Sequence, residues 1–367
     1  MTAAWPSADD RLVRGYRRLL LAYPSRHRRR HGTEVVTTLL EMAEPGQRRP
    51  RLAEAVHLVA SGLRLRFRLP AGRPLMALAA LLTALTMGGF GAAAGSWLGA
   101  QTFADLPDDA ALTRLVQQAG ADGAERHSHS TGSPWMAEGV AVHGPLDGTW
   151  DAEQVRQRFA ADGWSVSGLK PRSGGNGIFH EDESITYVPL HGAWFSATSN
   201  GLILHVDGLA PADSRFVDTG IGHVVIDAWP ERTVAFLPLV VLGTIGGLLV
   251  GWLLAAAVAY RMVAAPPAGR RAAAALWGAA LLTLALPVVA LYGNVMRVFR
   301  DGSRHEGSPL TVHSAFTPGE YYPFGPQWLV LGLTVAGLTV AGLAVAVAAV
   351  LAARPGEQQP QPAVVPG

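Results

Sequence analysis

The chain has 367 residues, of which 49% are hydrophobic and only 16% charged, and its formal net charge is +2. An ordinary soluble domain carries about 25% charged residues and a disordered chain has few hydrophobic ones, so this composition favours a membrane protein. The sequence contains no cysteine and a single lysine, Lys170, which lies outside any phosphate-binding-loop motif. These absences exclude disulfides, thiol nucleophiles, cysteine-ligated metals and lysine-dependent nucleotide sites.

Residues 1–73 are predicted to form a basic helical module of three short helices. The first helix ends at Pro24, because proline cannot continue a helix, and Thr33 is a candidate N-cap for the second. The third helix follows Pro50 and places five apolar residues on one side: Leu52, Val56, Val59, Leu63 and Phe67. We expect the apolar sides of the three helices to pack against one another in a small bundle.

A short motif in this module is formed by Tyr23-Pro24, the basic run 26–30, Gly32 and Glu34, and Arg49-Pro50 follows it. The motif resembles the N-terminal module of uncharacterised actinobacterial multipass membrane proteins, in which an arginine-rich YP and GxE pattern precedes the first membrane span. The resemblance covers only this module and implies a lineage rather than an activity.

Eight arginines of the module are predicted to contact a membrane surface, where anionic headgroups attract each of them by about 1 kcal/mol. Two alternatives stay open for the basic run 26–30, namely a nucleic-acid contact and a simply solvated loop. No recognition helix or base-reading aromatic pattern accompanies the run, so we expect no nucleic-acid partner. The predicted surface residues are Arg26, Arg28, Arg29, Arg30, Arg64, Arg66, Arg68 and Arg73.

Four stretches are long and apolar enough to cross a bilayer, which takes about 20 helical residues. None of their hydrophobic segments contains Asp, Glu, Lys, Arg or His, and none has the polar side of a soluble core helix. We therefore predict transmembrane helices at residues 74–99, 234–260, 272–296 and 328–353.

The loops between these helices alternate in charge. Residues 1–73 hold 15 Arg against 6 acidic residues, a net of +9, whereas residues 101–233 hold 8 Lys/Arg against 18 acidic residues, a net of −10. The positive-inside rule then places residues 1–73, the loop 261–271 and a disordered tail, 354–367, in the cytoplasm. Residues 100–233 and 297–327 are expected outside, in a multi-pass protein of the cytoplasmic (plasma) membrane whose first span serves as an uncleaved anchor.

Glycines recur at four-residue spacing in the first two spans. Small residues at this spacing let helix backbones approach closely in lipid, so we predict packing between these spans or with a second copy. The alternative is that an Ala/Gly-rich sequence produces the spacing by chance. The predicted packing residues are Gly91, Gly95 and Gly99 in the first span and Gly243, Gly247 and Gly251 in the second.

Residues 100–233 are predicted to form a small α+β domain, because short periodic runs alternate there with turn residues. The dipeptide Asn200-Gly201 is a typical hairpin turn. We expect helices at 108–119 and 151–161, strands at 139–143, 164–169, 184–190, 193–197, 202–207 and 223–228, a polar loop at 127–133 and a turn at 173–177.

Chemistry-bearing motifs are scarce in this domain. His127, His129 and the acidic string 180–183 could ligate zinc if further ligands converged, but solvated histidines are the simpler interpretation. The sequence has neither an HExxH nor a GxSxG motif. We therefore predict no catalytic, cofactor or metal site, and no enzymatic activity.

The predicted fold is an all-α membrane part of four transmembrane helices, an N-terminal cytoplasmic three-helix module and a small extracytoplasmic α+β domain. A sensory, regulatory or accessory protein that couples the two soluble parts is the first functional interpretation. The layout of one span, an external domain and three further spans also resembles that of some ABC-type permeases, whose ATPase is a separate chain. An ion-coupled carrier ranks lower, because such pathways need ionisable residues inside the membrane. Expected partners are the lipid bilayer and a second copy or another membrane protein.

Overall fold

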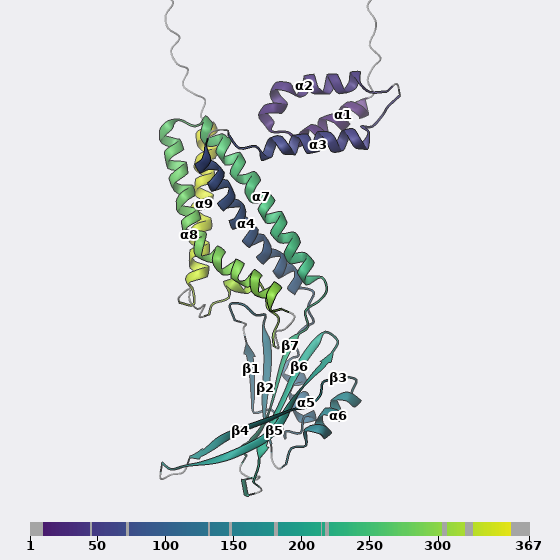
Figure 1. Ribbon diagram of the computed structural model, residues 1–367, viewed down its shortest axis with the longest axis vertical. Coiled ribbons are helices and arrows are strands. Elements are labelled where there is room, and N and C mark those ends of the chain that lie inside the picture. The colour runs from purple at the N-terminus through teal and green to yellow at the C-terminus, as the bar shows by residue number, and fades with distance from the viewer. Residues whose placement is uncertain are drawn as a thin grey trace, which may run out of the picture. The chain divides into compact units, whose positions relative to one another are not determined.

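The computed structural model describes residues 10–44, 46–70, 73–130, 133–146, 149–179, 183–213, 215–216, 220–302, 307–319 and 326–353 (Figure 1). The chain forms two compact units. One comprises Met1–Thr86, Leu248–Leu282 and Gly337–Gly367, and the other comprises Met87–Gly247 and Thr283–Ala336. The predicted tail 354–367 lies outside the described residues.

The N-terminal part of the first unit is a helical module, defined here as residues 10–67. Its elements are α1 (Asp10–Leu19), a 3₁₀ turn η1 (Leu20–Ala22), α2 (Ser25–Glu41) and α3 (Leu52–Phe67). Tyr16 is fully buried, and its hydroxyl donates a hydrogen bond to Glu54 Oε2 at 2.8 Å, which ties α1 to α3. The buried core of the module consists of Leu12, Tyr16, Leu20, Tyr23, Val36 and Leu58.

Two predictions about this module were wrong. Helix α2 begins at Ser25 rather than after Thr33, because Pro24 takes the N-cap position and the arginine-rich run that follows has good helix propensity. The apolar side predicted for the third helix does not enter the bundle: Leu58 and Gly62 are the buried residues of α3, whereas Leu52 is 81% exposed. The bundle therefore uses a different side of α3 from the one with the longest apolar run.

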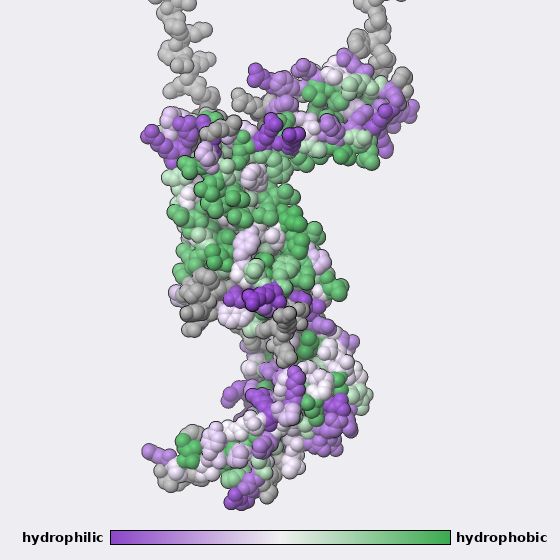
Figure 2. Space-filling view, in the orientation of Figure 1, coloured by the Kyte–Doolittle hydropathy of each residue, from purple (hydrophilic) through white to green (hydrophobic). Residues whose placement is uncertain are grey.

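Within the described residues, four helices are long and apolar enough to cross a membrane, as predicted. They are α4 (Pro74–Ala100), α7 (Phe236–Ala264), α8 (Pro267–Arg300) and α9 (Leu329–Ala353). Hydrophobic residues dominate the surface over these helices (Figure 2). Only residues 265 and 266 separate α7 from α8, so most of the predicted loop 261–271 is helical.

The part of the second unit between α4 and α7, residues 101–235, is called the sheet domain here. It contains helices α5 (Asp109–Gln118) and α6 (Ala152–Ala161) and a seven-stranded, fully antiparallel sheet. The strand order is β1-β2-β7-β6-β5-β3, and β4 also pairs with β5. The strands are β1 (Arg126–Ser130), β2 (Gly139–Leu146), β3 (Ser165–Val166), β4 (Lys170–Phe179), β5 (Ile185–Ser199), β6 (Leu202–Pro211) and β7 (Gly222–Pro230).

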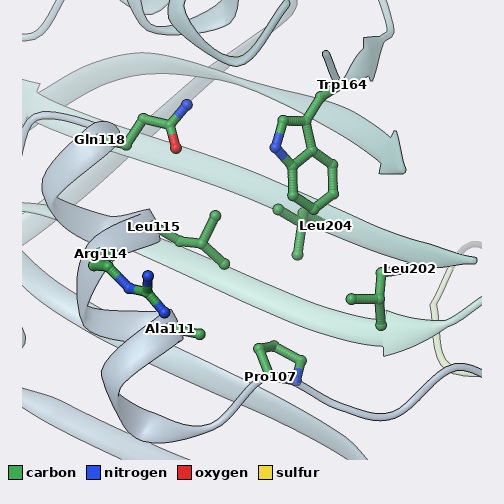
Figure 3. A pocket seen from close by; sticks show the side chains of 8 residues that line it. All are labelled: Pro107, Ala111, Arg114, Leu115, Gln118, Trp164, Leu202 and Leu204. Carbon is green, nitrogen blue, oxygen red and sulfur yellow. The ribbon is translucent and has the colours of Figure 1, made fainter. Parts of the chain in front are cut away.

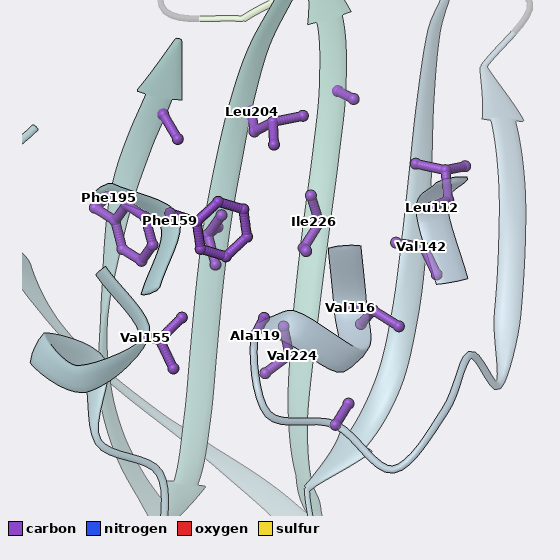
Figure 4. Packing of buried hydrophobic residues seen from close by; sticks show 14 of the residues in the cluster. Leu112, Val116, Ala119, Val142, Val155, Phe159, Phe195, Leu204, Val224 and Ile226 are labelled. Atoms are coloured by element: carbon purple, nitrogen blue, oxygen red, sulfur yellow. The ribbon is translucent and has the colours of Figure 1, made fainter. Parts of the chain in front are cut away.

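The two short helices cover one face of this sheet (Figure 4). Asp108 and Asp151 cap α5 and α6 by accepting hydrogen bonds from backbone N–H groups of the first turn. Alternate residues of the central strands point toward these helices, and Phe159 of α6 packs against Phe195 of β5 with ring centroids 5.7 Å apart. Because side chains alternate along each strand, the opposite face of the sheet carries the other half of the residues.

The predicted α+β domain is present, but three strand predictions were wrong. Strand β1 occupies the predicted loop at 127–133, and β4 includes the predicted turn at 173–177. Strand β5 is one 15-residue strand instead of two. In each case a long neighbouring strand supplies hydrogen-bond partners to polar or glycine-rich residues whose own propensity for strands is low. The hairpin turn at Asn200-Gly201 is confirmed, and both residues have positive φ.

Candidate functional site

The loop between β1 and β2 is bonded to the segment between α8 and α9, and this contact is called the joint here. The backbone N–H of Ala137 donates to Pro309 O at 2.8 Å, and that of Thr311 donates to Trp135 O at 2.9 Å. A β-bridge pairs Met136 with Leu310. These contacts form a single antiparallel β-bridge between the β1–β2 loop of the sheet domain and the segment between α8 and α9.

Two buried polar side chains of the long helices complete the joint. Asn294 of α8 donates through Nδ2 to Pro134 O at 2.7 Å. Ser96 of α4 accepts a hydrogen bond from the backbone N–H of Val312 at 2.9 Å and bonds His313 Nδ1 at 3.0 Å. Both Ser96 and Asn294 are 0% exposed. A buried polar group that loses its partner costs about 1–3 kcal/mol, so these contacts fix the loops against α4 and α8.

The joint also contains a histidine and an arginine. Burial lowers the pKa of His313 to about 4, so the imidazole bonded to Ser96 is neutral at physiological pH. Arg297 of α8 donates through Nη1 to Asn294 Oδ1 at 3.1 Å and lies 5.4 Å from the centre of the Trp135 ring. The Asn294 side chain is therefore held at both its oxygen and its nitrogen.

Five of the six glycines predicted to pack in the spans, all except Gly251, lie where α4 and α7 approach closely. A Cβ added at Gly91 would lie 3.0 Å from the Cα of Gly247, and one added at Gly243 would lie 3.1 Å from the Cα of Gly95. At Gly99 a Cβ would lie 2.8 Å from a ring carbon of Phe236. These spaces admit no side chain, so the two backbones approach as closely as glycine allows.

Gly251, the sixth predicted glycine, is also on α7 and is buried. Gly246, on the same helix, is exposed and a Cβ there would meet nothing within 4 Å. The close contact thus belongs to one side of α7 and is not a general effect of its glycine content.

The face of the sheet opposite α5 and α6 carries a diagonal row of rings. The His205 ring on β6 lies 4.4 Å from that of Trp194 on β5 and 6.3 Å from that of Trp229 on β7. Lys170 Nζ lies 4.1 Å from the centre of the Trp194 ring. The row presents aromatic edges and a cation at a sheet surface that neither short helix covers.

Two carboxylates lie on the same face, next to this row. Asp207 is 8% exposed and pairs with Arg172, while its Oδ1 has no hydrogen-bond partner within the described part of the chain. Burial raises the pKa of Asp227, although nearby His205 and His143 oppose the shift. The face therefore carries two carboxylates that are largely shielded from solvent.

The histidines considered as metal ligands, His127 and His129, form hydrogen bonds to α5. His127 Nε2 bonds Thr113 Oγ1 at 3.1 Å, and His129 Nε2 bonds Asp109 Oδ1 at 3.0 Å, so both tie β1 to α5. Among the described residues no group of three His, Asp or Glu could hold a metal ion. Residues 180–182 of the acidic string lie outside the described residues.

A shallow groove of about 300 Å³ lies between α5 and the start of β6 (Figure 3). Its wall is apolar, and the polar groups come from Arg114 and Gln118 on α5, opposite Trp164. Gln118 is already bonded to Asp162 Oδ2 at 2.8 Å.

The predicted membrane-surface arginines have several environments. Arg29, Arg30, Arg64, Arg68 and Arg73 are exposed, and Arg28 is half-buried in α2. Arg66 has a structural role, because its Nη2 donates to Leu21 O at 2.6 Å. The side chain of Arg26 lies outside the described atoms, although its backbone belongs to α2.

The residues of the joint were not predicted from the sequence. Ser96 and Asn294 are polar residues near the ends of apolar spans, and such residues usually bond within their own helix, as Thr86 Oγ1 does to Leu82 O. Their isolation among apolar neighbours was the one signal in the sequence.

When the chain is compared with known proteins, no protein family, curated protein or solved structure matches it.

Proposed function

We propose that the chain is a polytopic protein of the cytoplasmic membrane with a sensory or regulatory function and no enzymatic activity. In this proposal α4, α7, α8 and α9 cross the membrane, the sheet domain lies outside and the helical module lies in the cytoplasm. The positive-inside rule supports this orientation, since residues 1–73 carry a net +9 and residues 101–233 a net −10. The resemblance of the module to that of actinobacterial multipass membrane proteins agrees with it.

The joint is the observation that carries the functional part of the proposal. A displacement of the loop around Pro134 must either break buried hydrogen bonds or move α8 through Asn294. A displacement of the segment around Val312 acts in the same way on α4 through Ser96. The helical module directly precedes α4 in the chain. A displacement of α4 can therefore reach the module through the short segment between α3 and α4.

The uncovered face of the sheet is the proposed input surface. The row of Trp194, His205 and Trp229 suits a ligand or protein that offers an apolar or aromatic surface.

Hydrogen–deuterium exchange of the full chain in lipid nanodiscs tests the joint. In Ser96→Ala the N–H of Val312 loses its acceptor, and we expect faster exchange in both 307–316 and 133–138. Thr86→Ala is the matched control, because the Thr86 hydroxyl bonds only within α4 and its loss should leave both segments protected. Faster exchange in 307–316 alone would contradict coupling between the two segments.

Co-purification in a mild detergent tests the class of function. We expect a regulatory protein to be recovered on the helical module, and deletion of residues 1–67 should abolish its recovery. Stoichiometric recovery of an ATPase would instead support a permease subunit and would contradict the proposal.

A further inference from the structure

Helix α3 has two apolar sides, and among the described residues only one of them packs inside the protein. Leu58 and Gly62 face the bundle and are buried. On another side of the helix, Leu52, Val56 and Leu63 are 81%, 60% and 38% exposed. A soluble helix rarely leaves such an aligned apolar stripe in water.

The exposed residues are aligned along the helix. Steps of four and three residues lead from Leu52 through Val56 and half-buried Val59 to Leu63, so all four lie on one side. We call this side the lipid stripe. Figure 2 shows hydrophobic surface along the helix that Figure 1 labels α3.

The exposed charged side chains of α3 itself are positive. Arg64 and Arg68 are exposed on α3, and Arg73 follows just before α4. The one acidic residue of α3, Glu54, points into the bundle, where it accepts the hydrogen bond from Tyr16. The stripe is therefore flanked by arginines, with no acidic side chain of its own helix on the exposed side.

Side chains of a long apolar helix hold the end of α3. Trp252 Nε1 of α7 donates to Phe67 O at 3.0 Å, and the Tyr260 hydroxyl donates to Arg68 O at 2.9 Å. Tryptophan and tyrosine are enriched where membrane helices pass the lipid headgroups, because their rings are apolar and their tips are polar. Tyr260 lies four residues before the end of α7, where such a belt is expected, whereas Trp252 lies nearer the middle of the helix.

We propose that α3 is an interfacial helix that lies in an anionic lipid surface. The lipid stripe enters the boundary between headgroups and acyl chains, and Arg64, Arg68 and Arg73 meet the lipid phosphates. The module would then dock onto the membrane beside its own first span, through a surface that its bundle leaves uncovered. Anionic lipid is favoured over a second copy or a partner helix because the stripe is flanked by arginines and its end is continuous with α4.

Spin labelling of the full chain tests this proposal, and the absence of native cysteine makes single-site labels straightforward. Nitroxides are attached to V56C and L63C, and the chain is placed in nanodiscs of phosphatidylcholine and phosphatidylglycerol in equal amounts. Collision rates are measured with oxygen, which is enriched in lipid, and with a nickel chelate, which stays in water. We expect oxygen collisions to dominate at both positions.

H57C is the matched control, because His57 is exposed on α3 next to the stripe but on its polar side, and nickel collisions should dominate there. Dominant nickel collisions at positions 56 and 63 would overturn the proposal, since the stripe would then lie in water. Exclusion of both reagents would also overturn it, because a second copy or a partner protein would then cover the stripe.

The lipid charge is tested in nanodiscs of phosphatidylcholine alone. There we expect the oxygen collision rate at positions 56 and 63 to fall and the nickel collision rate to rise. The double variant R64Q/R68Q should change both rates in the same direction in the anionic discs. Identical collision rates in the two lipids would overturn the requirement for an anionic surface.

Discussion

The sheet domain and the helical module both contain short amphipathic helices, but the apolar sides of these helices are buried to different extents. In the sheet domain, α6 buries Val155 and Phe159 against the sheet. In the module, α3 buries one side and leaves Leu52 and Val56 exposed. An apolar pattern therefore identifies residues that share a side of a helix. The pattern alone does not tell whether protein, lipid or water covers that side.

Truncation of one residue on each apolar side should give the largest difference between the two regions. Phe159→Ala removes a fully buried ring from the core of the sheet domain and should lower its free energy of unfolding by about 3–5 kcal/mol. Val56→Ala, on the exposed stripe, should change the stability of the detergent-solubilised module by less than about 0.5 kcal/mol. Pulse proteolysis of the full chain in urea measures both. Equal losses at the two positions would show that the stripe is packed inside the protein.

The contact between α4 and α7 offers a third kind of packing, in which backbones rather than side chains meet. Gly243→Ala would place a Cβ 3.1 Å from the Cα of Gly95 and against the carbonyl oxygen of Gly91, so the helices must separate. We expect a loss of about 1–3 kcal/mol, measured as a lower thermal unfolding temperature in detergent.

Gly246→Ala is the control for this prediction, because the added methyl group would meet nothing within 4 Å. It should keep or slightly raise the unfolding temperature, since alanine favours helix over glycine. A Gly243→Ala chain as stable as the Gly246→Ala chain would contradict the close approach of α4 and α7.

The smallest predicted effect concerns Asp227, which lies on the uncovered face of the sheet. Burial raises the pKa of Asp227, which means that the folded protein disfavours the ionised carboxylate. Below the ordinary value of 3.8 the unfolded chain is protonated too, and folding carries no penalty from this group. As pH rises above that value, the unfolded chain ionises more readily than the folded one, and the wild-type protein loses stability.

Asp227→Asn should therefore raise the thermal unfolding temperature at neutral pH, and the gain should shrink as pH falls toward 3.8. Thermal unfolding of both proteins across this range measures the effect. A gain that is independent of pH, or an asparagine variant less stable than the wild type at neutral pH, would show that ionised Asp227 is well solvated or paired.

The sequence predicted the elements whose pattern is local. The four apolar helices, the helices α5 and α6, and the hairpin at Asn200-Gly201 all follow from neighbouring residues. Strands β1 and β4 did not, because the polar run 126–130 and the glycine-rich run 173–177 are strands only by pairing with β2 and β5.

The candidate site could be predicted only in part, for a similar reason. The spacing of the glycines in α4 and α7 pointed to Gly91, Gly95, Gly99, Gly243 and Gly247, which lie at the close approach, but it also pointed to Gly251, for which no such contact is shown. The joint depends on Ser96 and Asn294, whose partners lie more than a hundred residues away in Val312 and Pro134, and no short-range pattern encodes such a pairing. The exposed side of α3 was misassigned because its periodicity is equally good for packing in a bundle and for contact with lipid.

The sidedness of the two regions is the central claim, and labelling of intact cells with a membrane-impermeant maleimide tests it most directly. Ser196→Cys marks the uncovered face of the sheet and Arg29→Cys marks the helical module, in a chain without native cysteine. We predict that position 196 is labelled in intact cells, whereas position 29 is labelled only after permeabilisation. Labelling of position 29 in intact cells, or protection of position 196 until permeabilisation, would contradict the proposed topology.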